Sequence, residues 1–347
     1  MSLGDNMKEK IRQELESLMT EIDFSGVVSI YQYGELLYQS GRGFRDRSNE
    51  LNNNLATRFG IASGTKLFTA LGIGTLIEQG KLSLEDRVFN YFKEVFPTYD
   101  PSVTVGQLLS HTSGLPDYFD EDKIEDFDNF TVSVPWYDLK RPRDYFKVFP
   151  KEEMKFSPGT LFNYNNSGYI LLAALISEIS GMPYTEYIEQ SILKPLGLSD
   201  SGFYPMNKLP KNTAIGYIDA QDGWRTNVYN LPIVGGGDGG LFTTISDLNK
   251  FWEGVYSGHV ISKDLVETFF SNIIQTKPES DSYYGYGIWI YDAKDLATEV
   301  YIMGADAGIS FKSAVVKEKE LVYTVISNTG EGAWPILKKI VQLGLDT

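Results

Sequence analysis

The sequence predicts an α+β fold in which an antiparallel sheet is flanked by helices and a mostly helical region is inserted between two parts of the sheet. Segments rich in β-branched and aromatic residues lie at both ends of the chain, the middle has helical periodicity, and the 347 residues contain no repeat or clear linker. We therefore expect one domain over residues 7–347. Residues 7–60 and 237–347 would form an α/β part, and residues 61–236 a mostly helical part.

The N-terminal residues predict a helix followed by a hairpin. The stretch "MSLGDNMKEKIRQELESLMTEI" is amphipathic from about Met7 onward. In "SGVVSIYQYGELLYQSGRGFRD", two β-rich runs lie on either side of Tyr33-Gly34. A short turn between two such runs predicts a pair of antiparallel strands.

Three segments in the middle of the chain have the apolar spacing that predicts helices. They cover residues 64–80, 103–114 and 168–193, and loops rich in Asp, Pro and Asn separate them. Residues 117–150 are acidic, aromatic and irregular, so we expect a long ordered loop there.

The C-terminal residues predict the rest of the sheet and a closing helix. Four strand-like segments cover residues 284–292, 298–304, 309–318 and 320–328, with charged or glycine turns between them. The helical stretch "AWPILKKIVQLGL" follows. Together with the N-terminal hairpin, these strands would complete one antiparallel sheet.

The composition excludes several classes of partner and site. A net charge of −15 argues against nucleic acid and anionic membrane surfaces as partners. The chain has no cysteine, which excludes disulfides, thiolate zinc sites and a cysteine nucleophile. Its two histidines, His111 and His259, are far apart in the sequence, so we expect no metal site.

The hydrophobic segments are too short for a membrane protein. No apolar run reaches the length that spans a bilayer, and the N-terminus lacks the apolar core of a signal peptide. We therefore expect a cytoplasmic protein, with export left open if a leader segment has been removed.

The segment "FGIASGTKLFTALGIGTLIEQG" places a hydroxyl and an amine at the start of a predicted helix. Ser63 and Lys66 are three residues apart, so both side chains lie on one helix face. A serine must lose its proton as it attacks a carbonyl, and a lysine held neutral by burial at a helix N-terminus can accept that proton. The chain has no Gly-x-Ser-x-Gly elbow. The structural alternative is a capping serine followed by a surface lysine.

A second polar motif, Tyr164-Asn165-Asn166, lies about a hundred residues later, in a turn before a strongly apolar helix. A tyrosine followed two residues later by an asparagine supplies a phenol for proton transfer and an amide that can orient a lysine or a substrate carbonyl. Both residue types are also common in turns, so the motif alone leaves a structural role open.

These two motifs, together with "VTVGQLLSHTSGLPDY" and "GGGDGGLFTTISDLNKF", resemble in order the signature segments of the serine β-lactamase and penicillin-binding-protein superfamily. The resemblance covers nearly the whole chain and is strongest to the branch of class C β-lactamases, D-stereospecific peptidases and related esterases. It implies a β-lactamase/transpeptidase-like fold. It also implies a hydrolase without metal or organic cofactor that acts on a small-molecule or peptide amide or ester.

The resemblance also assigns the reactive residues. It implies that Ser63 is acylated, that Lys66 is its activating base, and that Tyr164 shares the proton transfers. Asn166 matches the asparagine that contacts the lysine and the substrate carbonyl. His111 is attractive as a base, but the equivalent residue of the family is structural.

The third motif of the family departs from its usual pattern. The family has Lys or His, a small hydroxyl residue and Gly on the strand beside the nucleophile, whereas "YIMGADAGISFKS" has Gly304 or Ala305 where the cation would stand. We expect Asp306 to contact the substrate. We expect the backbone N–H of Ala307 or Gly308 to stabilise an oxyanion.

Two functions fit these motifs. The first is a serine hydrolase that forms an acyl-enzyme on Ser63 and hydrolyses an amide or ester, as a β-lactamase, D-amino-acid peptidase or esterase does. The alternative is a penicillin-binding or sensing module that is acylated with little turnover. Because the cation is missing and Asp306 is acidic, we expect poor use of acyl donors that carry a carboxylate.

Overall fold

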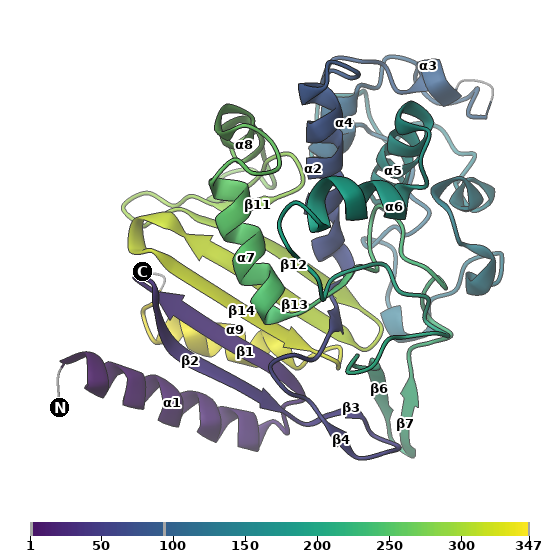
Figure 1. Ribbon diagram of the computed structural model, residues 1–347. Coiled ribbons are helices and arrows are strands. Elements are labelled where there is room, and N and C mark those ends of the chain that lie inside the picture. The colour runs from purple at the N-terminus through teal and green to yellow at the C-terminus, as the bar shows by residue number, and fades with distance from the viewer. Residues whose placement is uncertain (1–2, 93–94, 346–347) are drawn as a thin grey trace.

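The computed structural model describes residues 3–92 and 95–345, and within them an antiparallel sheet of eight strands organises the chain (Figure 1). The strand order is β2-β1-β14-β13-β12-β11-β10-β9, so the two ends of the chain are paired inside the sheet. The strands are β1 (Gly26–Gln32), β2 (Glu35–Arg42), β9 (Ile274–Gln275), β10 (Ser282–Tyr284), β11 (Trp289–Tyr291), β12 (Glu299–Asp306), β13 (Ile309–Val316) and β14 (Leu321–Ser327). The predicted α+β class is confirmed.

Both faces of this sheet are buried, because successive side chains of a strand point to opposite sides. Val27 of β1 is paired with Ile326 of β14, and both belong to the larger hydrophobic core. The next pair, Val28 and Val325, belongs to the core on the other face. Each central strand is therefore a nearly continuous apolar run.

The two terminal helices cover one face of the sheet. They are α1 (Leu3–Glu21) and α9 (Ala333–Gln342), and Ile11 and Leu15 of α1 share a core with Ile336 and Ile340 of α9. Helix α1 begins at Leu3, four residues before the predicted start at Met7.

The remaining helices lie over the opposite face or in the region inserted between β5 and β8 (Figure 1). None of the helices in residues 3–92 and 95–345 combines the length and apolar composition needed to cross a bilayer. They are α2 (Thr65–Glu78), α3 (Phe89–Phe92), α4 (Val105–Leu109), α5 (Asn166–Ser180), α6 (Tyr184–Ile188), α7 (Ile245–Tyr256) and α8 (Lys263–Phe269). The division of the chain at residues 60 and 237 into two parts remains a prediction.

Short elements complete the fold. The helical turns are η1 (Ala62–Gly64), η2 (Phe127–Asn129), η3 (Trp136–Asp138), η4 (Pro142–Lys147), η5 (Glu189–Leu193) and η6 (Lys317–Lys319). The two-stranded pairs are β3 (Phe44–Asp46) with β4 (Leu51–Asn52), β5 (Phe59–Gly60) with β8 (Phe242–Thr243), and β6 (Tyr217–Ala220) with β7 (Gly223–Thr226).

Helix α2 is buried on every side, which explains why its sequence is apolar all round after the first turn. It packs against α5 and α6 as well as the sheet side of the core. At Gly72, an added Cβ would lie 2.7 Å from Ile188 Cδ1 and 3.0 Å from Ile176 Cδ1. Glycine at this position therefore allows the neighbouring helices to approach α2 closely.

The helix predicted over residues 103–114 is shorter in the structure. Helix α4 ends at Leu109, and His111 (φ 59°) and Gly114 (φ 74°) have left-handed backbone conformations that a helix cannot continue through. Residues 117–150 form the expected ordered loop, which contains the short helical turns η2, η3 and η4.

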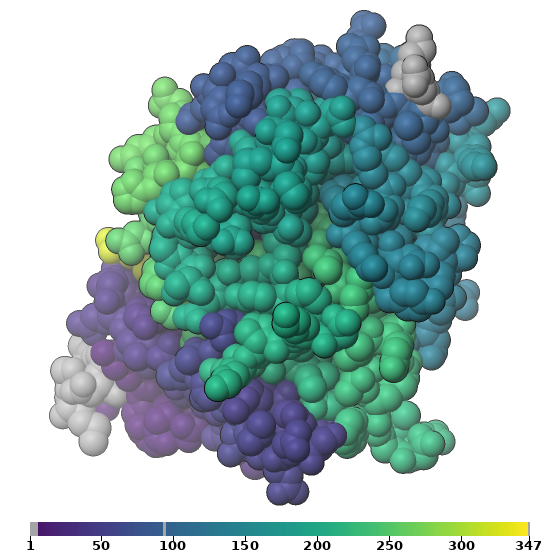
Figure 2. Space-filling view, turned by 45° about the vertical axis from the view of Figure 1, so that its right-hand side comes forward, coloured from purple at the N-terminus to yellow at the C-terminus, as the bar shows by residue number. Residues whose placement is uncertain are grey.

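N-terminal and mid-chain segments meet below the inserted region. The backbone N–H of Arg47 donates to Tyr217 Oη at 2.7 Å, and its guanidinium pairs with Asp219. In Figure 2, purple N-terminal residues lie beside teal and green residues from the middle of the chain in the lower half of the view. This contact joins the β3–β4 loop to the β6–β7 hairpin.

Strand β12 approaches the η1 turn closely enough to require a glycine. A Cβ added at Gly304 would lie 2.4 Å from the carbonyl oxygen of Ile61, 2.7 Å from the nitrogen of Ser63 and 3.0 Å from Ala62 Cβ. Two of these atoms are backbone atoms of the turn and cannot rotate away. The sheet and the start of α2 are therefore in direct backbone contact at Ser63.

We predict that Gly304→Ala destabilises the fold by about 1–3 kcal/mol, because the added methyl separates β12 from the η1 turn. Urea denaturation monitored by circular dichroism measures this change. Gly330→Ala is the matched control, since a Cβ there has no atom within 4 Å and should change the free energy of unfolding little. Equal stability of the two variants would contradict the close approach.

Candidate active site

Ser63 lies in the η1 turn, directly before helix α2. The preceding residue, Ala62, has a φ of 44°, a left-handed conformation that is uncommon outside glycine and is concentrated at functional sites. The Thr65 hydroxyl donates to the carbonyl oxygen of Ala62 at 2.7 Å and accepts from the N–H of Leu241 at 3.1 Å. The strained turn is thus held in place by the segment that leads into β8.

Lys66 is the second residue of helix α2 and is 1% exposed. Its Nζ is 2.9 Å from Ser63 Oγ, 2.7 Å from Asn166 Oδ1 and 2.8 Å from the carbonyl oxygen of Asp238. These three acceptors satisfy all three protons of an ammonium group. The surface lysine considered as an alternative is therefore wrong for this chain.

Burial makes the neutral form of Lys66 more accessible than that of an exposed lysine. Burial lowers the pKa of Lys66 from its ordinary value, although the carboxylates of Asp238, Glu121, Asp117 and Asp306 act in the opposite direction. When the amine is neutral, the contact with Ser63 can reverse, so that the hydroxyl donates to Nζ. This is the geometry that a general base requires.

Tyr164 and Asn166 are brought to the same place by the N-terminus of α5. Asn165 caps this helix by accepting from the N–H of Gly168 at 2.7 Å. The Tyr164 ring lies 4.8 Å from Lys66 Nζ. Burial raises the pKa of Tyr164 well above its usual value, and a hydrogen bond with Ser63 acts in the opposite direction. The four residues singled out from the two sequence motifs are therefore neighbours in space.

Asp117 fixes this helix start and was missed in the sequence. One carboxylate oxygen accepts from the N–H of Asn166 at 2.7 Å, and the other accepts from the N–H of Ser167 at 2.8 Å and its hydroxyl at 2.9 Å. Burial raises the pKa of Asp117 to about 6, and these hydrogen bonds oppose the shift. The residue anchors the loop after α4 to the N-terminus of α5.

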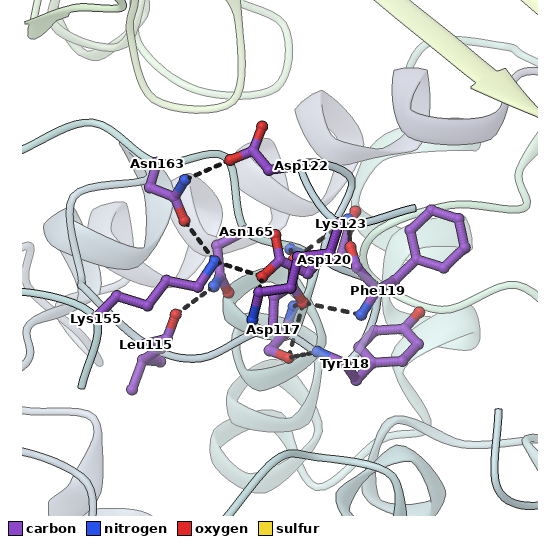
Figure 3. Close-up of polar contacts among 12 residues, drawn as sticks. Leu115, Asp117, Tyr118, Phe119, Asp120, Asp122, Lys123, Lys155, Asn163 and Asn165 are labelled. Atoms are coloured by element: carbon purple, nitrogen blue, oxygen red, sulfur yellow. Dashed lines mark hydrogen bonds and ion pairs between the residues drawn. The ribbon is translucent and has the colours of Figure 1, made fainter. Parts of the chain in front are cut away.

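A set of ion pairs and amide contacts holds the rest of that loop (Figure 3). Asp120 pairs with Lys155 at 2.9 Å and with Lys123 at 3.2 Å. Lys155 Nζ also donates to Asn163 Oδ1 at 2.8 Å, and Asn163 Nδ2 donates to Asp122 at 3.0 Å. Residues 117–123 are thereby tied to the segment that carries Tyr164.

His111 has a structural position. It is fully buried, and its Nδ1 accepts from the N–H of Asn165 at 3.0 Å. Its ring centroid lies 4.3 Å from that of Tyr164 and 4.6 Å from that of Tyr284. Burial holds the pKa of His111 well below its usual range, so the ring is neutral and supports the segment before α5.

A pocket opens beside Ser63, with a volume of about 60 Å³. Ser63 and Asn166 line it together with three carboxylates, Glu121, Asp238 and Asp306. Burial raises the pKa of Asp306 to about 7, and the charges of Asp238 and Glu121 act in the same direction. The site therefore concentrates negative charge next to the serine.

Asp238 is a second carboxylate that the sequence motifs did not identify as a site residue. It is the one charged residue in the run "GGGDGG", which was the signal available in the sequence. At Gly237 a Cβ would lie 2.2 Å from the carbonyl oxygen of Tyr169, so only glycine lets this turn press against α5. The backbone carbonyl of Asp238 accepts from Lys66, and the half-buried carboxylate is close enough for the charge of Lys66 to act on it. Its Oδ2 accepts from Tyr118 Oη at 2.5 Å.

The structure corrects the third motif. Ala307 and Gly308 form the turn between β12 and β13, where the Ala307 carbonyl accepts from Asn227 Nδ2 at 2.9 Å, and neither residue lines the pocket. Gly304 is the residue that faces the serine turn, so the position two residues earlier on that face is Ile302, which is buried in the core. Neither of these two positions on that face of β12, Gly304 and Ile302, carries a cationic side chain.

Ala305 lies on β12 next to Ser63 and lines the same pocket. Asp306 and Ile309 are the pair that closes the two-residue turn, and Ala305 is paired with Ser310. Because hydrogen-bonded and non-hydrogen-bonded pairs alternate in an antiparallel ladder, the N–H of Ala305 points away from β13. It is available to a ligand beside Ser63.

Known proteins are similar to this chain over most of its length. A model of the Beta-lactamase family matches residues 11–341. Penicillin-binding protein PbpX of Bacillus subtilis is 31% identical over 282 residues, which cover 80% of this chain and 65% of PbpX. This chain thus spans about two thirds of the length of that relative.

Solved structures share the fold. A penicillin-binding protein from Bacillus halodurans has a TM-score of 0.89 and 37% identity, over 95% of this chain and 99% of that one. A D-amino acid amidase from Ochrobactrum anthropi has a TM-score of 0.78 at 23% identity, over 98% of this chain and 97% of that one. The predicted resemblance and fold are confirmed, and the chain belongs to the Beta-lactamase family.

Proposed function

We propose that this protein is a serine hydrolase that forms an acyl-enzyme on Ser63 and hydrolyses an amide or ester. The observation that carries the proposal is the position of Lys66 Nζ, buried between Ser63 Oγ at 2.9 Å and Asn166 Oδ1 at 2.7 Å. A lysine kept from water and bonded to a serine hydroxyl is suited to accept the proton of that hydroxyl.

Acylation would begin when neutral Lys66 accepts the Ser63 proton and Oγ attacks the substrate carbonyl. The negative charge that develops on the carbonyl oxygen requires two donors. The backbone N–H groups of Ser63 and Ala305 are suitable, because β12 contacts the serine turn at Gly304. We assign Ala305 to the role that was expected for Ala307 or Gly308.

Collapse of the tetrahedral intermediate breaks the bond to the leaving amine or alcohol, which must gain a proton. Tyr164 is suited to pass on the proton held by Lys66, because its hydroxyl bonds Ser63 and its ring is adjacent to Nζ. Water then attacks the ester formed on Ser63, and the same groups act in reverse order to release the acid. Asn166 would hold Lys66 in position throughout.

The carboxylates of the pocket bear on substrate choice. Ligands with a carboxylate near Asp306 would meet a like charge at close range, which can cost several kcal/mol. We therefore infer a preference for neutral or cationic acyl donors over penicillins and cephalosporins. The second candidate, a penicillin-binding module, is favoured by two of the similar proteins, PbpX and the Bacillus halodurans protein, which are named as penicillin-binding proteins.

Ser63→Ala is expected to abolish turnover and labelling by a fluorophosphonate, with a Tm close to that of the wild type because the change opens no large cavity. Mass spectrometry of the labelled protein locates the adduct. Ser102→Ala, at an exposed serine, is the control and should label normally. An adduct on another serine would remove the basis of the assignment. A stoichiometric burst without steady turnover would select the penicillin-binding module.

Lys66→Met retains most of the side-chain volume and removes the amine, so acylation should slow by at least ~100-fold. Tyr164→Phe should slow acylation, deacylation or both. Stopped-flow measurement of a single turnover separates the steps, and Lys81→Met, on the exposed surface, is the matched control. If both active-site variants kept near-normal rates, the base would lie elsewhere.

Discrimination against carboxylate-bearing donors should depend on pH, because Asp306 has a pKa of about 7. Asp306 is mainly neutral at pH 6 and charged at pH 8. The ratio of kcat/KM for a cephalosporin to that for nitrophenyl acetate should therefore fall at least ~5-fold over this interval. The ionisation of Lys66 affects both substrates and cancels in the ratio. Asp306→Asn should flatten the profile, and an unchanged profile in this variant would refute the role of Asp306.

A further inference from the structure

The pocket beside Ser63 lies on the side of the serine away from the proton relay. Ser63, Asn166 and Ala305 line it, whereas Tyr164 is not among the described residues of its wall. In the proposed mechanism the leaving group receives its proton from the Tyr164 side. The part of the substrate that stays on Ser63 must therefore extend into the pocket.

The charges of the pocket are unbalanced. Glu121, Asp238 and Asp306 line it, and the described residues of its wall include no Lys, Arg or His. Lys66 is the nearby cation, but its three protons are used by Ser63, Asn166 and the Asp238 backbone. Asp238 and Asp306 are half-buried and Glu121 is exposed, and the charge of Lys66 offsets only part of their combined negative charge. Partly desolvated carboxylates in excess over cations leave the pocket suited to a ligand that supplies positive charge.

The wall also contains a buried hydroxyl with no partner. Tyr145 is 1% exposed, and its Oη has no hydrogen-bond partner among the described residues. Tyr145 Oη and Asp238 Oδ1 each lie 3.2 Å from the position that a Cβ would take at Gly236. The two oxygens therefore flank the same point of the glycine-rich turn. A phenol oxygen and a carboxylate oxygen in this arrangement can both accept from one ammonium group.

Aromatic rings surround these oxygens. The rings of the wall are those of Tyr118, Phe119, Trp136, Tyr145, Tyr204 and Phe242. The rings of Tyr118 and Tyr145 meet edge to face at 5.6 Å, beside the carboxylate of Asp238 that Tyr118 bonds. Aromatic faces attract a desolvated cation, and they also accept the methylene groups next to it.

We propose that this pocket is a subsite for a primary ammonium group on the acyl part of the substrate, held by Asp238, Asp306 and Glu121 with the Tyr145 hydroxyl. The inference rests on the proposed function and specifies its substrate class: amides or esters of amino acids with a free amine.

The test compares four p-nitroanilides that differ at the α-carbon of the acyl group: those of L-alanine, D-alanine, N-acetylalanine and propionic acid. Removing the amine, or its charge by acetylation, should lower kcat/KM at least ~10-fold, the effect expected for a hydrogen bond to a charged group. Nitrophenyl acetate, whose acetyl group carries no amine for the subsite, reports acylation of Ser63 and serves as the reference substrate.

Two variants locate the effect. Tyr145→Phe removes only an unpartnered hydroxyl and should lower the alanyl-to-propionyl ratio ~3–10-fold, and Asp238→Asn should lower it further. Because each ratio is measured within one variant, a general loss of activity cancels. Tyr187→Phe removes a buried hydroxyl that bonds Thr75 outside the pocket, and the ratio should not change.

The outcomes separate the two proposals. If nitrophenyl acetate acylates Ser63 but the wild type uses propionyl and alanyl anilides equally, the ammonium subsite is wrong and the serine hydrolase stands. If Ser63 is acylated by none of the substrates, both are wrong. A preference for the free amine that Tyr145→Phe and Asp238→Asn both leave unchanged would also overturn the subsite.

Discussion

The burial of one lysine is the constraint on which the site depends. Lys66 is 1% exposed at the junction of the sheet, α2 and α5, where an ammonium ion would lose its hydration. The chain compensates with three acceptors, from Ser63, Asn166 and the Asp238 backbone. Each acceptor comes from a different part of the sequence, so the tertiary fold must be complete before the lysine has its partners. The chemistry of the serine and the packing of the core are therefore linked.

The carboxylates around this lysine act on both the amine and the ligand. Asp238 and Glu121 favour the charged form of Lys66 against the effect of burial, and they raise the pKa of Asp306 by repulsion in addition to the effect of its own burial. Asp117 has a structural role, because its carboxylate oxygens accept hydrogen bonds from the N–H groups at the N-terminus of α5. The site thus contains one acidic group that builds the scaffold and three that face the pocket, in a protein with a net charge of −15.

Most of the architecture and half of the site could be predicted from local sequence patterns. Runs rich in β-branched and aromatic residues at both ends of the chain predicted the sheet. The spacing of Ser63 and Lys66 predicted two side chains on one helix face. The turn carrying Tyr164 and Asn166 was recognisable because a capped, strongly apolar helix follows it. These features depend on residues within a few positions of one another, and over such short distances the sequence periodicity predicts the local backbone geometry.

Other features were decided only by the tertiary structure. The sequence contained no local sign that the Asp238 carboxylate and the unpartnered Tyr145 hydroxyl would flank the same point of the glycine-rich turn, because they come from segments far apart in the chain. The assignment of Ala305 in place of Ala307 depended on the register of β12 against β13 and on the point where β12 contacts the serine turn. A shift of this register by one residue would turn every side chain to the opposite face of the sheet and every N–H to the opposite edge of the strand. By itself, the sequence determined which chemical groups the protein carries and which neighbours share a local face. Contacts between distant segments, fixed by packing and strand register, decided which of those groups act together.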